Sequence, residues 1–194
     1  MKILAFTDLH ASRTHLKAIY KKADKADIIV CCGDFSVFES EAERILAMLG
    51  KLKKPVLIIH GNHESEEYTK KVAEQNNLTF LHKAFFEQDG YVFAGFGGGG
   101  FSIQDPEFEQ FGHTIQLYPK KKKLILISHG PPKGCNQDLI DKDHVGCKSR
   151  RDIIKKLKPD LVLFGHIHET FHVHDRWDST LLINPGPDGE LIEL

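Results

Sequence analysis

Long apolar runs are missing from this sequence: none approaches the roughly 20 residues that a membrane-spanning helix needs. No leader is visible either, since Lys2 is followed by a short apolar run that ends at Thr7 and Asp8. Neither sign of charge is in excess, because 26 lysine and arginine residues stand against 27 aspartate and glutamate residues. The formal net charge of -1 gives no general attraction to nucleic acid or to anionic membranes. We therefore expect a soluble, cytoplasmic protein.

Cysteine is scarce, and none of the four residues has the C-x-x-C spacing of a zinc knuckle. Cys31 and Cys32 are adjacent on a predicted strand, so their side chains point to opposite faces and a bond between them would be strained. Cys135 and Cys147 fall in a predicted loop region, and reduced thiols are expected. The only basic run, at 120–123, is interpreted as a solvated turn before a strand.

The first third of the chain alternates short apolar runs with amphipathic segments. The pattern predicts strands at 2–7, 27–32 and 55–60, and helices at 12–23, at 40–52 and after Ser65. Ser40 and Glu43 fit a capping box, and Ser65 fits a second N-cap. This β-α-β-α-β order predicts a parallel sheet with helical crossovers.

The rest of the chain has fewer helix signals. Strands are predicted at 91–100, 113–119, 123–128 and 160–165, a helix only near 150–157, and no helix from 78 to 117. Short strands at 171–175, 180–186 and 190–194, separated by turns, indicate an added antiparallel component. With 41% hydrophobic residues and no repeat or linker, we expect one domain spanning residues 1–194, built from two sheets packed face to face with helices outside.

Polar residues collect where five of the predicted strands end. In chain order they are Asp8 and His10, then Asp34, then Asn62 and His63, then His129, and finally His166 and His168. Because ligands bind beyond the carboxyl ends of parallel strands, we expect these side chains to converge. Glycines at 33, 61, 130 and 165 flank them and let the backbone turn sharply.

Imidazoles combined with hard oxygen ligands suit first-row divalent metals such as Mn, Fe, Co, Ni and Zn. The groups outnumber the ligands that one catalytic ion needs, and they fit two ions with one bridging carboxylate. Two ions roughly 3.5–4 Å apart can share a hydroxide and clamp the oxygens of a phosphoryl group. Asn62 can offer one ion a neutral carbonyl oxygen, whereas a further aspartate there would repel an incoming phosphate.

The sequence resembles the calcineurin-like metallophosphoesterases, in particular the small single-domain prokaryotic type. The resemblance rests on "DLH", "GD", "GNHE", "SHG" and "GHIH" and extends from Asp8 to Gly186. It implies an α/β fold, a four-layer α-β-β-α sandwich with two mixed sheets. It also implies that one ion is held by Asp8, His10, Asp34 and His168, and the other by Asp34, Asn62, His129 and His166.

The sequence departs from the protein-phosphatase branch of that family. In that branch the G-D pair is followed by an aspartate that orients the catalytic histidine and by an arginine that grips phosphate. Here those positions are Val37 and Phe38, which disfavours recognition of a phosphorylated protein. Glu64 and Glu39 are the remaining candidates for orienting His63.

The expected function is that of a metal-dependent phosphoesterase, a phosphodiesterase in preference to a monoesterase. A hydroxide shared by two divalent ions, with Mn favoured, attacks a small or nucleotide-like phosphodiester, and His63 protonates the leaving oxygen. His144, in a long loop between two ligand-bearing strands, is a candidate for substrate binding. Lys133, Lys148 and Arg150 are candidates for phosphate contact.

Two alternatives remain open at this stage. One is a phosphomonoesterase that uses the same site. The other is a non-catalytic metal-binding scaffold for protein interaction, although such scaffolds usually lose ligands that this sequence retains.

Overall fold

The computed structural model describes residues 1–118 and 122–194, so the first two lysines of the basic run at 120–123 lie outside the described residues. The helices are α1 (Arg13–Ala23), α2 (Ala42–Leu49), α3 (Glu66–Gln75), α4 (Pro106–Leu117), α5 (Lys148–Leu157) and the 3-10 helices η1 (Asn136–Asp138) and η2 (His168–Thr170). The strands are β1 (Lys2–Phe6), β2 (Ile28–Cys31), β3 (Val56–Ile58), β4 (Thr79–Phe80), β5 (Ala84–Gln88), β6 (Tyr91–Phe96), β7 (Lys123–Ser128), β8 (Leu139–Ile140), β9 (Asp143–His144), β10 (Leu161–Leu163), β11 (His174–Trp177), β12 (Thr180–Ile183) and β13 (Glu190–Glu193).

Both large sheets are mixed. The first has the order β13-β1-β2-β3-β4, in which β1 to β4 are parallel and β13 runs antiparallel to β1. The second has the order β11-β12-β10-β7-β6-β5, in which only the outer strands β11 and β5 run antiparallel to their neighbours. Helical crossovers join the parallel strands of the first sheet, as predicted, and α4 and α5 join β6 to β7 and β7 to β10 in the second.

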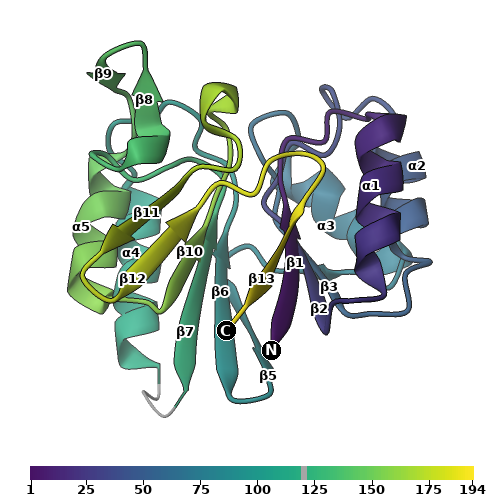
Figure 1. Ribbon diagram of the computed structural model, residues 1–194, viewed down its shortest axis with the longest axis horizontal. Coiled ribbons are helices and arrows are strands. Elements are labelled where there is room, and N and C mark those ends of the chain that lie inside the picture. Colours follow the sequence, from purple (N-terminus) through teal and green to yellow (C-terminus); the bar gives the residue numbers. More distant parts are fainter. Residues whose placement is uncertain (119–121) are drawn as a thin grey trace.

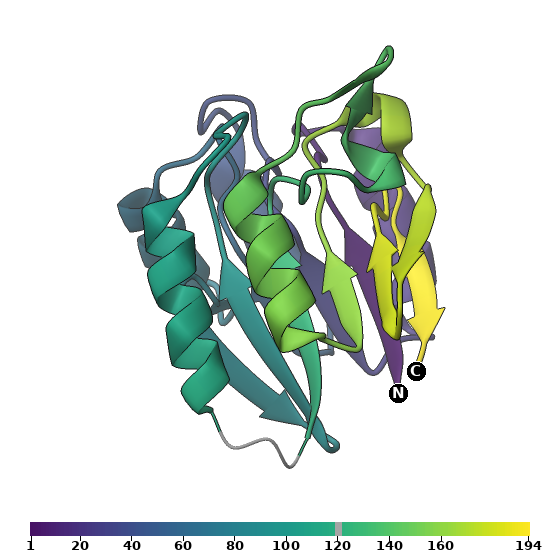
Figure 2. The same ribbon diagram turned by 90° about the vertical axis from the view of Figure 1, so that its left-hand side faces the viewer.

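Three apolar clusters separate four layers. The first cluster lies between the first sheet and α1, α2 and α3, and it includes Leu4 and Ile19. The second lies between the two sheets and includes Ile3 and Phe93. The third lies between the second sheet and α4 and α5, and it includes Phe108. Figures 1 and 2 show the same order of layers, which confirms the predicted α-β-β-α sandwich.

Side-chain alternation along the strands fills both faces of each sheet with apolar residues. Leu4 packs against the helices while its neighbour Ile3 packs between the sheets. Cys31 and Cys32 divide in the same way, as the sequence predicted, and all four cysteines are free and buried. Strands buried on both faces are typical of parallel sheets covered by helices. None of the helices in the described part of the chain is long and apolar enough to cross a bilayer.

The strand predicted at 113–119 is wrong, because most of this segment belongs to α4. The helix begins earlier, where the carboxylate of Asp105 accepts a hydrogen bond from the Phe108 backbone N–H at 3.0 Å. Phe108, Phe111 and Ile115 then lie at helical spacing on one buried face. The helical spacing of the apolar residues, with a period of about 3.6 residues, is evident only when the stretch of sequence considered begins at this N-cap.

The predicted capping interactions are also wrong. α2 begins at Ala42, after Glu41 in a left-handed conformation, and it ends at Leu49, three residues before the predicted end. Ser65 does stand at the N-cap of α3, but its hydroxyl donates to Glu39 Oε1 at 2.6 Å and not to the helix. The polar residues therefore identified the start of α3 but not its bonding partner, and they placed the N-cap of α2 one residue too early.

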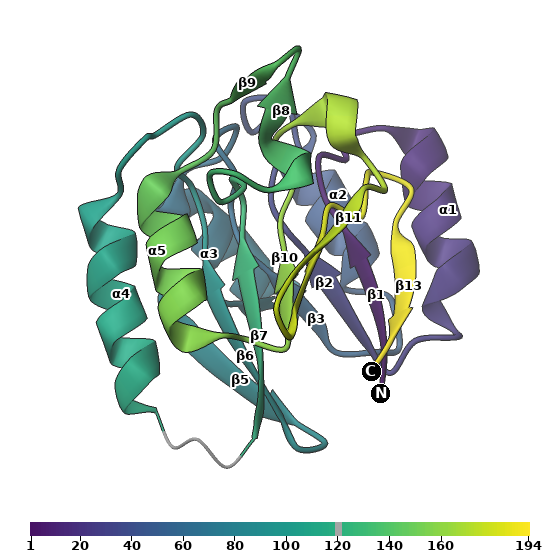
Figure 3. The ribbon, with the colours of Figure 1, turned by 60° about the vertical axis from the view of Figure 1, so that its left-hand side comes forward.

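The last part of the chain differs from prediction in its boundaries. η2 and a turn occupy the segment before His174, so β11 starts three residues later than the predicted strand at 171–175. β12 and β13 fall within the predicted strands. The carboxyl ends of β1, β2, β3, β7 and β10 lie at one edge of the molecule, where the loops that follow them meet (Figure 3).

Candidate metal centre

The eight polar residues predicted to converge do come together at this edge. Three overlapping groups form there, each with its ligand atoms within 4.8 Å of one another. The groups are Asp8, His10 and His168; His10, Asp34 and His63; and Asp34, His129 and His166. Asn62 joins the third group, because its Oδ1 lies 3.0 Å from Nε2 of His129.

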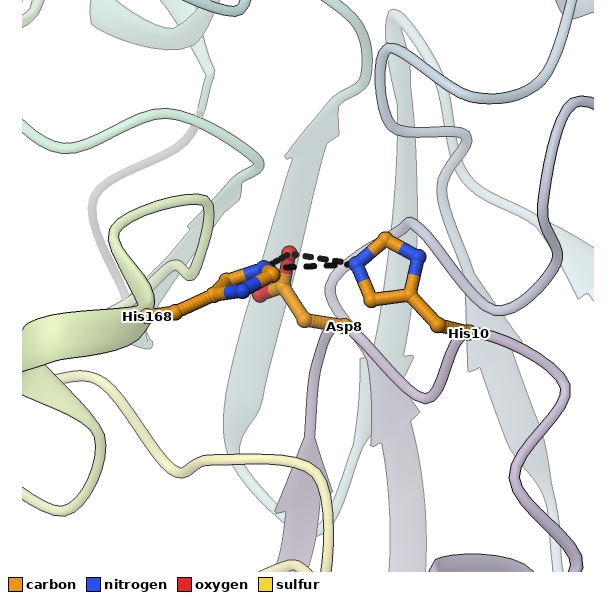
Figure 4. Close-up of side chains that lie close together, drawn as sticks. All are labelled: Asp8, His10 and His168. Carbon is orange, nitrogen blue, oxygen red and sulfur yellow. Dashed lines mark hydrogen bonds and ion pairs between the residues drawn. The ribbon is translucent and has the colours of Figure 1, made fainter.

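In the first group, one carboxylate oxygen faces two imidazole nitrogens (Figure 4). Oδ1 of Asp8 lies 3.4 Å from Nε2 of His168 and 3.8 Å from Nε2 of His10, and the two nitrogens are 3.3 Å apart. The other oxygen of Asp8 is held in place by the Thr7 hydroxyl at 2.6 Å and the His166 backbone N–H at 2.9 Å. The carboxylate is therefore fixed through Oδ2 and leaves Oδ1 directed at the histidines.

His129 faces oxygen atoms through both ring nitrogens. Nδ1 lies 2.9 Å from the Cys32 carbonyl oxygen, which can only accept, so this nitrogen carries a proton. Nε2 lies 3.4 Å from Oδ2 of Asp34 as well as close to Asn62. Burial alone would lower the pKa of His129, but the hydrogen bond and charge of Asp34 outweigh burial and raise this pKa to about 9. The geometry thus requires a proton or a metal ion on Nε2.

Asp34 is shared by two of the three groups. Its Oδ1 accepts a hydrogen bond from the His63 backbone N–H at 2.9 Å, and its Oδ2 faces His129 and, at 3.9 Å, Nε2 of His63. Burial would raise the pKa of Asp34, but the hydrogen bond with His129 lowers it below its ordinary value. An ionised carboxylate between two groups of donors is the arrangement that a bridging ligand needs.

Several of these residues adopt a left-handed backbone that side chains rarely tolerate. The φ angles are 49° at Asp8, 44° at His10, 50° at Asp34 and 72° at His166. The sequence suggested that neighbouring glycines make the turns, and Gly33, with a φ of 96°, does so. Elsewhere the strain lies on the polar residues themselves, as is common where a site requires a particular geometry.

Comparison with known proteins decides the family. The sequence model of the family of calcineurin-like phosphoesterases matches residues 1–170 of this chain. This chain belongs to that family. Its members are metal-dependent phosphoester hydrolases that typically hold two divalent ions.

The relatives include proteins from archaea and bacteria. An uncharacterised protein of Methanocaldococcus jannaschii is 31% identical, over 96% of this chain and 88% of its own length. A probable cyclic nucleotide phosphodiesterase of Coxiella burnetii is 26% identical, over 77% of this chain and 63% of that protein. The solved structure of TT1561 of Thermus thermophilus superposes with a TM-score of 0.79 at 18% identity, over 95% of this chain and 88% of that one. This last likeness shows the fold.

The residues at the site fit the two divalent ions of the calcineurin-like family. Oδ1 of Asp8 and Nε2 of His166 are buried without any hydrogen-bond partner among the described residues. Nδ1 of His10 lies 3.2 Å from the Ser36 carbonyl oxygen, which leaves Nε2 as the lone-pair nitrogen that faces Asp8. Backbone carbonyls that fix the tautomer of a ligating histidine are usual around metal ions in proteins.

Glu64, the last residue of "GNHE", joins two of the ligand-bearing loops. Its carboxylate accepts hydrogen bonds from the backbone N–H groups of Asp34 at 3.1 Å, Ser36 at 2.9 Å and Gly61 at 3.0 Å, and from the Ser36 hydroxyl at 2.7 Å. It is buried, and burial raises its pKa. Sequence reasoning offered Glu64 as a partner of His63 and missed this role, for which the local spacing gives no signal.

Two glycines are required by close approach and not by backbone conformation. A Cβ at Gly61 would lie 1.9 Å from Oδ1 of Asp34, and one at Gly165 would lie 2.2 Å from Oδ2 of Asp8. Both carboxylates therefore occupy space that any side chain would fill. Here the glycines of "GNH" and "GHIH" act by leaving room for a carboxylate that follows another strand.

The glycine run at 97–100 packs against the same site. A Cβ at Gly100 would contact both Asn62 and His166, while one at Gly99 would lie 2.3 Å from Nη2 of Arg150. Arg150 is 0% exposed and its Nη2 lies 3.2 Å from Asp105, so this candidate phosphate contact is turned inward behind the loop. Lys148, the other candidate on α5, is exposed at the start of that helix.

His144 stands on the β8–β9 hairpin, which rises at the edge of the molecule that carries the site (Figure 1). Its Nδ1 lies 2.5 Å from Oδ1 of the buried Asp138, so the ring is oriented with Nε2 outward. The third cation candidate, Lys133, donates to the His144 carbonyl oxygen at 2.8 Å. Substrate contact by His144 stays a prediction.

The ring of His63 is held by aromatic contacts. The Phe38 ring stacks on it with centroids 4.3 Å apart, and His10 meets it edge-on at 4.8 Å. The carboxylates of Glu39 and Glu64, which the sequence offered as orienting partners, bond elsewhere: Glu39 accepts from the N–H and hydroxyl of Ser65. Phe38 therefore replaces a hydrogen-bonding partner with a packing surface.

We expect Glu64→Gln to destabilise the fold by about 2–4 kcal/mol, because its amide N–H₂ must face backbone N–H donors that now share a carboxylate. Metal affinity should fall in the same variant, since the loops of Asp34 and Asn62 lose their common anchor. Denaturant unfolding and metal titration measure the two effects. Glu39→Gln is the matched control and should change either quantity little. Equal, small effects of both substitutions would contradict the anchoring role of Glu64.

Metal binding should release about one proton from His129 at neutral pH, because the metal-free imidazole is protonated below a pKa of about 9 and a ligand must be neutral. His10 and His166 have pKa values lowered by burial, so they bind without releasing protons, whereas the hydrogen bond with Asp8 raises the pKa of His168, which adds to the release. Apparent affinity should therefore rise with pH up to about 9. Calorimetry in buffers of different ionisation enthalpy measures the release. Heats that do not depend on the buffer at pH 7 would rule out a protonated His129.

Proposed function

We propose that this chain is a phosphodiesterase that uses two divalent ions, with Mn favoured, to hydrolyse small or nucleotide-like phosphodiesters. One ion is held by Asp8, His10, Asp34 and His168, and the other by Asp34, Asn62, His129 and His166. The observation that carries this proposal is the overlap of three groups: Asp34 lies with His129 and His166 on one side and with His10 on the other, and His10 also lies with Asp8 and His168. When bound, the ions lower the pKa of water and withdraw charge from phosphoryl oxygens.

The protein's own groups favour a diester over a monoester. A monoester dianion brings more negative charge than a diester, and two of the three cations that the sequence offered for phosphate contact are engaged elsewhere. Arg150 is buried beside Asp105, and Lys133 bonds a carbonyl oxygen on the β8–β9 hairpin. The probable activity of the Coxiella burnetii relative, a cyclic nucleotide phosphodiesterase, lends support.

His63 is assigned as the general acid. Its side chain is 21% exposed, and its Nε2 lies 3.9 Å from Oδ2 of Asp34. The ring is positioned by Phe38 and His10, so it can hold a proton toward the leaving oxygen without changing rotamer. His144 is assigned to substrate contact, through an Nε2 that Asp138 directs outward.

The function is tested by comparing bis(p-nitrophenyl) phosphate with p-nitrophenyl phosphate under Mn, Fe, Co, Ni, Zn or Mg. We expect the diester to be hydrolysed faster, and Asp34→Asn to lower kcat/KM by about 10³-fold through loss of charge at the bridge. A monoester preference with every metal would replace the proposal by the phosphomonoesterase. Bound metal without hydrolysis of either ester would favour the scaffold.

The role of His63 is tested with a series of leaving groups. A general acid contributes about 10²–10⁴-fold, and most when the leaving group is poor. His63→Gln should therefore slow an alkyl diester far more than a nitrophenyl diester while retaining two bound ions. His113→Gln, at an exposed site on α4, is the control. An equal loss for every leaving group would exclude proton donation by His63.

A further inference from the structure

Exposed apolar side chains gather at the mouth of the metal centre. Among the described residues, the exposed large hydrophobic side chains are Val37, Phe38, Phe101, Ile103, Leu117 and Leu191. Four of these six lie in two short loops, 37–38 and 101–103. Phe38 is 76% exposed and Phe101 is 60% exposed, which for phenylalanine indicates a surface that serves binding.

Each of the two phenylalanines contacts a histidine of the site. Phe38 lies face to face with His63, with centroids 4.3 Å apart and planes 24° apart. Phe101 meets His166 edge-on, with centroids 4.4 Å apart. His63 and His166 belong to different groups that share Asp34. The two aromatic side chains therefore flank the metal centre, one beside each of these groups.

The loop that carries Phe38 holds it in this exposed position. Phe38 has a φ of 47°, a conformation rare for a bulky residue, and Glu39 follows with a φ of 65°. A bridge between Val37 and Ser40 closes the turn, and the Glu39 N–H donates to the His63 carbonyl oxygen at 3.1 Å. The ring is thus fixed against the candidate general acid and not left free.

The loop that carries Phe101 is also anchored at both sides. The Ser102 N–H donates to the Gly99 carbonyl oxygen at 3.0 Å, and the Ile103 carbonyl oxygen accepts from the Lys148 N–H at 2.8 Å. The glycine run places the same loop against Asn62 and His166. Both rings are therefore presented by fixed backbone, as recognition of a defined group requires.

We propose that Phe38 and Phe101 select phosphodiesters whose organic substituents are planar and aromatic, of which nucleobases are the natural example. The proposal rests on the proposed function. A diester carries two substituents, and the metal centre has one exposed aromatic ring on each side. Base stacking on aromatic side chains is tolerant of base identity, so the preference extends to any base or aryl group.

Equilibrium binding tests the proposal without turnover. Adenosine 5′-monophosphate and ribose 5-phosphate share the phosphate and the sugar and differ in the base. With Mn present, we expect calorimetry to show adenosine 5′-monophosphate binding about 5- to 100-fold more tightly. In the variant Phe38→Ala with Phe101→Ala, this ratio should approach one. Phe38→Tyr with Phe101→Tyr should restore it, and Leu117→Ala, which removes an exposed side chain at the end of α4, should leave it unchanged.

A pair of diesters with one leaving group gives the kinetic counterpart. Bis(p-nitrophenyl) phosphate and methyl p-nitrophenyl phosphate both release nitrophenol, and only the retained substituent differs. We expect the ratio of their kcat/KM values to fall in the alanine variant. Because both esters use His63 alike, the ratio cancels any displacement of that ring.

The outcomes separate the two proposals. Hydrolysis of both diesters, with both ratios unchanged by the alanine substitutions, overturns the aromatic selection and leaves the phosphodiesterase standing. No hydrolysis with any metal overturns the phosphodiesterase, and the binding ratio then decides the aromatic selection alone. Unchanged ratios together with a change of sedimentation in the alanine variant would make this surface an interface between copies of the chain.

Discussion

Two carboxylates, of Asp8 and Asp34, are held out of water at the junction of two sheets, and their negative charge must be balanced there. Much of the surrounding structure follows from this constraint. Nε2 of His129 faces Oδ2 of Asp34, and Nε2 of His168 faces Oδ1 of Asp8. Because an ionised carboxylate has no proton to donate, a proton on the imidazole or a metal ion between the two groups is needed to balance the charge. The glycines opposite both carboxylates leave space for them, and the backbone at several of these residues is strained to aim them inward. Strained backbone at Asp8 and Asp34 is therefore part of what directs their charge into the site.

Prediction from the sequence succeeded in placing together the residues that stand at strand ends. Asp34 follows an apolar strand directly, and parallel strands bring such positions to one edge whatever the intervening loops do. It failed where the partner lies far away in the chain. Glu64 bonds backbone groups some 30 residues earlier, and no local spacing reveals that. The N-cap at Asp105 was missed because the segment considered, 113–119, begins in the middle of α4.

The positions of the two exposed phenylalanines beside the metal centre, Phe38 and Phe101, could not be predicted from the sequence either. Phe38 could be recognised as a departure from a family pattern, but its contact with His63 depends on a left-handed turn that the sequence does not announce. Phe101 carries no motif at all, and only the packing of the glycine run against Asn62 brings it to the site. Residues at strand ends are brought together by the sheet and can be predicted, whereas the positions of exposed residues in loops depend on tertiary contacts.

The chain crosses from the first sheet to the second and returns with its last strand, so each sheet carries about half of the site. Asp8 and Asp34 come from the first sheet, and His129 and His166 come from the second. The apolar cluster between the sheets, which includes Ile3 and Phe93, therefore determines how the two halves of the site are positioned relative to one another. A methyl group gained or lost in that cluster shifts Asp8 and Asp34 relative to His129 and His166, although the substituted residue is far from the site. Substitutions between the sheets can thus change the geometry of the site through residues that do not contact the substrate.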